Sequence, residues 1–159
     1  WFVALPECQA RTEVALGDAR LSLEAEPPQR YDLLAVDAFS SDAIPVHLLT
    51  REAFDIYRRH LAGPRSVIAV HVSNRHLDLE PAVRALAQAS ALHGVSVGEN
   101  ASGLARTSLW LVLSPSPDRF RVPELAPYGP TWSGPARPVR LWTDAYSDVL
   151  GTLRILHPS

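Results

Sequence analysis

Segments with the hydrophobic pattern of β-strands alternate with helix-like segments over most of the chain. Compact apolar runs at residues 31–36 and 66–72 are typical of strands buried on both faces, and shorter strand-like runs lie at 12–16, 95–97 and 108–113. Strands that alternate with helices predict a mostly parallel sheet flanked by helices, so the expected class is α/β.

Three helices are predicted, each from a capping residue followed by apolar residues at helical spacing. Asp18 is expected to cap a short helix, and Thr50 a second helix that stops before Gly63. Asp78 and Pro81 are expected to open a third. The apolar positions of the second and third helices are Ala53, Phe54, Tyr57, Leu61, Val83, Leu86 and Ala87.

The alternation of strand-like and helix-like segments ends at residues 114–138. This stretch holds half of the fourteen prolines, and its composition predicts a long surface loop. An edge strand is expected at 139–142, followed by a final helix with Tyr146, Val149, Leu150 and Leu153 on its apolar face. The 159 residues are therefore expected to form one domain, 1–159, with a Pro-rich loop near its end.

Composition excludes several classes of function. The net charge of -2 argues against a nucleic-acid-binding protein, which normally has a basic excess. The single cysteine, Cys8, cannot form an internal disulfide, and the six histidines show no metal-binding pattern. All fifteen basic residues are arginine, which rules out a catalytic lysine. Neither a membrane-spanning run nor a signal peptide is visible, so a cytoplasmic location is expected.

Polar residues at the carboxyl ends of the predicted strands are the candidate site, because ligands of open parallel sheets bind there. They lie at 17–20, 37–45 and 72–75. In the second stretch, Asp37 and Asp42 could attract a cationic amine, and one of them could accept its proton. Alternatively, Asp37 only ends the strand, while Ser40, Ser41 and Asp42 satisfy the donors of a turn and cap the segment after it. Asp18 could likewise cap a helix or bind a nucleotide base.

Four stretches together resemble the polyamine synthase family, and the closest likeness is to spermidine synthase-like proteins often fused to membrane transporter segments. The stretches are GDAR at 17–20, YDLLAVDAFSSDAIPVHLLTREAF at 31–54, AVHVSNRHLDLEP at 69–81 and LWTDAYSDVL at 141–150. The resemblance implies a Rossmann-like sheet of the methyltransferase type. It also implies transfer of an aminopropyl group from decarboxylated S-adenosylmethionine, a co-substrate and no resident cofactor, to an amine such as putrescine.

The resemblance also assigns roles to individual residues. Asp37 matches the aspartate that accepts the proton of the attacking amine, and Asp42, beside Ser40 and Ser41, matches the residue that holds the diamine. Asp18 and Ala19 match the pair that contacts the adenine. In such a fused protein the domain would lie at the cytoplasmic face of the membrane.

Three departures from the family pattern leave other functions open. The glycine-rich turn and the ribose-binding acidic residue are absent, so they and the first strands of the sheet are expected to precede Trp1. Without a central strand, exposed apolar edges would favour a homodimer. DAFSSD is longer than the DSSD of true spermidine synthases, and Asp144-Ala145 replaces a pair of aspartates. The alternatives are a methyltransferase that uses S-adenosylmethionine and a silent remnant that binds a nucleoside or polyamine.

Overall fold

Four strands and several helices make up the described part of the chain, which confirms the α/β class. The computed structural model describes residues 11–37, 45–74, 76–98, 108–128, 132 and 138–153. The strands are β1 (Leu33–Val36), β2 (Val67–His71), β3 (His93–Gly98) and β4 (Leu109–Ser114). The α-helices are α2 (Ala19–Ala25), α3 (Arg51–Arg59) and α4 (Glu80–Ala89), and short 3-10 helices are η1 (Val46–Leu48), η2 (Pro117–Phe120), η3 (Ala126–Tyr128) and η4 (Leu150–Thr152).

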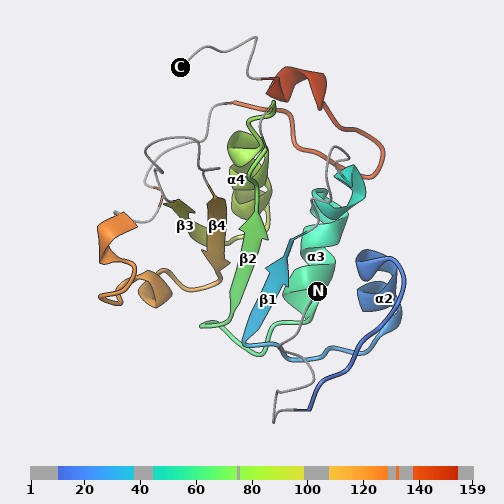
Figure 1. The fold of residues 1–159 in the computed structure, drawn as a ribbon, viewed down its shortest axis with the longest axis vertical. Coiled ribbons are helices and arrows are strands. Elements are labelled where there is room, and N and C mark those ends of the chain that lie inside the picture. Colours follow the sequence, from blue (N-terminus) through green and yellow to red (C-terminus); the bar gives the residue numbers. More distant parts are fainter. Residues whose placement is uncertain are drawn as a thin grey trace.

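The sheet has the order β1-β2-β4-β3 (Figure 1). β1 and β2 pair in parallel, whereas β4 is antiparallel to both of its neighbours. β3 therefore runs in the same direction as β1 and β2, and β4 alone runs against them. The expected common direction thus holds for three of the four described strands, but only one of the three pairings is parallel.

Helices α3 and α4 cover one face of this sheet. Side chains from both helices join those of β2 and β4 in a single core that excludes water, with these residues at its centre: Phe54, Tyr57, Ile68, Val70, Val83, Leu86, Leu111 and Leu113. The register explains this, because Ile68 lies opposite Leu113 and Val70 opposite Leu111, so all four point to the same face. The alternation along β2 and β4 therefore fixes which side the helices cover.

The helix-capping predictions hold for α3 and fail in one detail for α4. The Thr50 hydroxyl accepts the backbone N–H of Ala53, as expected of an N-cap. In α4 the N-cap is Leu79, with no side-chain capping bond, and Pro81 lies in the first turn. Asp78 is thus not the cap, because proline needs no N–H partner and already fixes the helical φ there.

Two predictions about strands in the first part of the chain are wrong. Residues 12–16 form no strand, and Val14 and Leu16 are 68% and 94% exposed. Alternating apolar and polar residues do not by themselves stabilise a strand, and no described strand pairs with this segment. The run at 31–36 does form β1, but among the described strands β1 lies at the edge of the sheet and pairs with β2 alone. Leu33 is consequently 61% exposed, so the strand is not buried on both faces.

The region after β4 also differs from the prediction. Residues 139–142 form no strand, and only η4 is helical in the predicted final helix. Thr143 and Tyr146 exchange two backbone hydrogen bonds instead, which turns the chain, and Leu150 is 73% exposed. The expected loop at 114–138 includes η2 and η3, and its Trp132 Nε1 donates to Ser96 Oγ. No helix in the described ranges is long and apolar enough to cross a membrane.

Candidate functional site

The carboxyl ends of β1 and β2 lie at the same edge of the sheet, because the two strands are parallel. Asp37 follows β1 directly, and its Oδ1 lies 2.7 Å from Nδ1 of His71, the last residue of β2. The Asp37 side chain is 56% exposed and that of His71 only 20%. The predicted proton acceptor is therefore a solvent-accessible carboxylate held at one oxygen by a mostly buried imidazole.

The other residues predicted to bind the amine, Ser40, Ser41 and Asp42, lie outside the described residues. Their segment, 38–44, begins directly after Asp37 and ends shortly before η1. Asp37, which precedes this segment, and His47, which follows it in η1, each belong to a polar cluster.

Asp18 and Ala19 begin helix α2. Asp18 Oδ1 accepts the backbone N–H of Leu21 at 3.0 Å, so the predicted N-cap is confirmed. Its Oδ2 lies 2.7 Å from Nε2 of His47. The hydrogen bond from Leu21, and then that from His47, hold the pKa of Asp18 below its usual value. Both oxygens of Asp18 are thus bonded within the fold, while the proposed contact with adenine stays a prediction.

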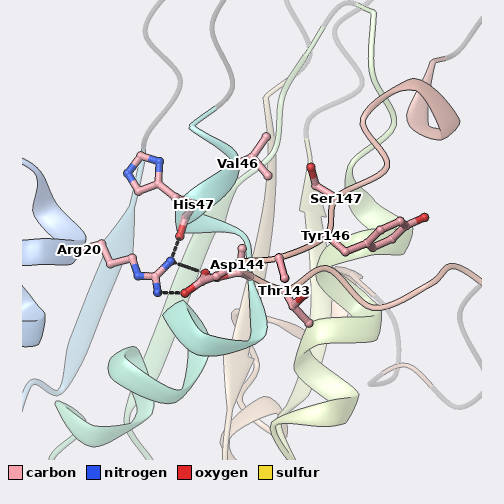
Figure 2. A pocket seen from close by; sticks show the side chains of 9 residues that line it. Arg20, Val46, His47, Thr143, Asp144, Tyr146 and Ser147 are labelled. Atoms are coloured by element: carbon pink, nitrogen blue, oxygen red, sulfur yellow. Dashed lines mark hydrogen bonds and ion pairs between the residues drawn. The ribbon is translucent and has the colours of Figure 1, made fainter.

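A cavity of about 370 Å³ opens beside His47 (Figure 2). It is lined by residues of helix α2, of η1 and its connection to α3, and of the C-terminal segment: Arg20, Val46, His47, Thr50, Thr143, Asp144, Ala145, Tyr146 and Ser147. All of these residues except Val46 and Ala145 have polar side chains, and the cavity joins segments more than a hundred residues apart in the sequence.

Arg20 connects the segments that line this cavity. Its guanidinium forms a two-pronged ion pair with Asp144, with 2.6 Å between Nη1 and Oδ1 (Figure 2). Nη1 also donates to the backbone carbonyl of His47 at 2.7 Å, and the Thr50 hydroxyl donates to Asp144 Oδ1 at 2.8 Å. Because Arg20 is buried and all its partners come from other segments, it ties α2, η1 and the C-terminal turn together.

The ion pair shifts the pKa of both partners. The hydrogen bonds from Arg20, and then from Thr50, lower the pKa of Asp144, and the hydrogen bond to Asp144 raises the pKa of Arg20. Both groups therefore stay charged under ordinary conditions. A further ligand in the cavity would meet a carboxylate whose charge is already compensated.

Sequence reasoning missed Arg20, His47, Thr50 and Asp144 as one cluster, and it gave His71 no role in a site. Arg20 and Asp144 do lie within two of the stretches that carry the family resemblance, GDAR and LWTDAYSDVL. A signal for them was therefore present, but their pairing across 124 positions cannot be read from one sequence.

Comparison with known proteins gives little beyond the architecture. No protein-family model matches the chain, and no curated protein matches it. Among solved structures, it is similar to the crystal structure of MnmC2 from Aquifex aeolicus, with 18% sequence identity and a TM-score of 0.47. The match covers 85% of this chain and 44% of that chain, so this chain spans less than half of that neighbour's length. A likeness of this size does not extend to activity.

Proposed function

We propose that the protein is an aminopropyltransferase-like enzyme that moves an aminopropyl group from decarboxylated S-adenosylmethionine to an amine such as putrescine. The observation that supports this most is Asp37, an exposed carboxylate at the carboxyl end of β1 with one oxygen bonded to His71. None of the described residues donates to the other oxygen, Oδ2. An anionic oxygen at this edge suits both the binding of an ammonium group and the removal of its proton.

In the proposed reaction, the ammonium group of the amine gives one proton to Asp37 Oδ2. The nitrogen lone pair that this releases forms a bond to the aminopropyl carbon attached to the sulfonium sulfur. The C–S bond breaks, its electrons stay on sulfur, and a neutral thioether leaves. The transfer uses no redox partner, so all that it needs from the chain is a proton acceptor and the positioning of two substrates.

The remaining roles follow the family resemblance. Asp42, with Ser40 and Ser41, would hold the second amine of the acceptor. Asp18 and Ala19 would contact the adenine of the co-substrate. The Asp18 side chain keeps 33% exposure despite its two bonds, so an adenine amino group would share this carboxylate with His47 or displace it.

A direct test is to incubate the purified full-length protein with putrescine and decarboxylated S-adenosylmethionine labelled in its aminopropyl group. We expect labelled spermidine and an equal amount of methylthioadenosine, separated by chromatography. A parallel reaction with methyl-labelled S-adenosylmethionine tests the other enzymatic reading. A methylated amine there, with no aminopropyl product, would favour a methyltransferase, whereas no product in either reaction would favour a silent binding protein.

A further inference from the structure

A directional chain of hydrogen bonds continues from Asp37 into the sheet. His71 Nε2 lies 2.8 Å from the Ser73 hydroxyl oxygen, and that oxygen accepts the backbone N–H of Leu109 at 2.6 Å. The chain thus runs from the backbone of β4 through Ser73 and His71 to Asp37 Oδ1. Its inner end is part of the sheet, and its outer end is the carboxylate.

These contacts determine which tautomer of His71 fits. Oδ1 of ionised Asp37 can only accept, so Nδ1 of His71 must carry a proton and donate it. In the neutral ring Nε2 is then an acceptor. Ser73 can serve as its donor because the Leu109 N–H leaves the hydroxyl hydrogen free. The one arrangement that satisfies all four groups with a neutral imidazole is therefore Leu109 N–H to Ser73, Ser73 O–H to Nε2, and Nδ1–H to Asp37.

The ring plane of His71 is also fixed. Trp110 of β4 stacks on it with 4.7 Å between the ring centroids and 18° between the planes. His71 and Trp110 are partners across β2 and β4, so the register of the sheet sets this stack. The imidazole cannot swing away from Asp37 without losing the stack and both hydrogen bonds.

The same three side-chain types occur in serine hydrolases, but exposure argues against that role here. In the hydrolase arrangement the serine is the reactive end and the aspartate is buried. Here Asp37 is the solvent-exposed end at 56%, and the serine oxygen already accepts a backbone N–H inside the sheet. The hydrogen-bonded series therefore exposes the carboxylate of Asp37, and not the hydroxyl of Ser73, to a ligand.

We propose that His71 is a positioning residue for Asp37, and that Ser73 selects the tautomer this requires. By holding Oδ1 through Nδ1–H, His71 leaves Oδ2 as the oxygen that faces the amine and takes its proton. This inference rests on the proposed function, because it assumes that Asp37 is the proton acceptor. It adds His71 and Ser73 to that function as two residues that act through Asp37.

The hydrogen-bond chain itself can be tested without any activity. Long-range ¹H–¹⁵N NMR spectra of the protein report which imidazole nitrogen carries the proton. We expect the signals of His71 to show protonated Nδ1 in the wild type and Nε2 shifted in Ser73→Ala, where its donor is lost. A His71 signal with protonated Nε2 and bare Nδ1 would overturn the proposal.

The kinetic test compares two amide replacements that differ in where they place a donor. The side-chain nitrogen of Asn lies near the position of Nδ1 and that of Gln near Nε2, so His71→Asn should keep the bond to Asp37 and His71→Gln should lose it. We expect kcat to fall by about 10–100-fold in His71→Gln and His71→Ala, with KM for the amine nearly unchanged. His71→Asn should recover most of the loss. Melting temperatures of the variants identify any loss caused by misfolding.

The outcomes separate this inference from the proposed function. If Asp37→Asn is inactive while His71→Gln and His71→Ala keep wild-type kcat, Asp37 is the acceptor and the role of His71 is wrong. If Asn and Gln reduce kcat equally, with both variants folded, the imidazole does more than hold a carboxylate, and positioning alone is wrong. If Asp37→Asn stays active, both proposals fail.

Discussion

Two aspartates of this protein each contact a histidine at the same distance, yet they differ in how much of the carboxylate is left for a ligand. Asp18 and His47 are 2.7 Å apart, as are Asp37 and His71. Asp18 also caps helix α2 and is the less exposed of the two, at 33% against 56%. The Asp18 pair lies in a cluster that connects distant segments, whereas the Asp37 pair lies at the open edge of the sheet.

An Asp–His contact therefore does not by itself indicate a carboxylate that is available to a ligand. In the Asp18 pair both oxygens are bonded, and the neighbouring Arg20 and Asp144 neutralise each other. Such a carboxylate contributes mainly to the folded structure. In the Asp37 pair the histidine is the inner partner, and one oxygen is left without a donor among the described residues. Substitutions should therefore separate the two regions, with the first affecting stability and the second affecting turnover.

The largest effect is expected for Asp37→Asn. The amide keeps the size of the side chain but cannot accept a proton, so turnover at saturating amine should fall by about 10²–10⁴-fold. The melting temperature should change little because the residue is exposed. Asp55→Asn, at an exposed position on α3, is the matched control and should retain full turnover. Turnover of Asp37→Asn within a fewfold of the control would contradict the assignment.

A large loss of stability is expected for Arg20→Met. Methionine fills the space of the buried stem but removes every bond of the guanidinium, and it leaves Asp144 with the Thr50 hydroxyl and without its ion-pair partner. Hydrogen bonds to charged groups contribute about 1.5–3 kcal/mol each. Because the Asp144 side chain is 45% exposed and water can replace part of the pairing, we expect a net loss of about 2 kcal/mol.

For a domain of this size, such a loss lowers the melting temperature by about 4–8 °C, which calorimetry or circular dichroism measures readily. Arg65→Met, at an exposed position, is the control and should shift it by far less. Equal shifts for the two variants would mean that Arg20 does not hold the segments together.

The acid dependence of stability tests the same cluster. The folded-state pKa of Asp144 is lowered from 3.8, so its contribution is fully present above that pH and is lost as the pH falls through the folded value. Asp144→Asn should therefore melt below the wild type at pH 6, and the gap should close as the pH falls below about 4. A gap that stays constant down to pH 2 would show that the charge on Asp144 does not matter.

The sequence predicted well what depends on local chemistry. Asp18 and Thr50 cap helices because a short oxygen-bearing side chain satisfies the first free N–H groups wherever a helix begins. The apolar spacing also identified the buried faces of α3 and α4, except at Leu61, which lies beyond the end of α3 and pairs with Tyr31 instead. The position of Asp37 at the carboxyl end of β1 was predicted because this residue follows an apolar run typical of a strand.

The predictions that failed depend on partners distant in the sequence. Residues 12–16 alternate like a strand but pair with no strand in the described part, and Leu150 has helical spacing but little to pack against. Arg20 and Asp144 pair across the whole domain, and His71 meets Asp37 only because β1 and β2 are neighbours. Pairing of this kind is a property of the folded topology, and one sequence contains no direct record of it.

The smallest effect is expected for Asp18→Asn, and it makes the sharpest comparison with Asp37→Asn. Asparagine is as good an N-cap as aspartate, because its carbonyl oxygen can accept the Leu21 N–H in the same way. Its amide can also donate to Nε2 of a neutral His47, so both hydrogen bonds persist and only the charge is lost. The melting temperature should therefore fall less than in Arg20→Met, and that of Asp18→Ala, which loses the cap as well, should fall further than that of Asp18→Asn.

If Asp18 contacts adenine as proposed, the Asn variant should raise KM for the nucleoside co-substrate and leave kcat nearly unchanged. A loss of kcat in Asp18→Asn as large as that in Asp37→Asn would contradict the division between a bonded carboxylate and a reactive one.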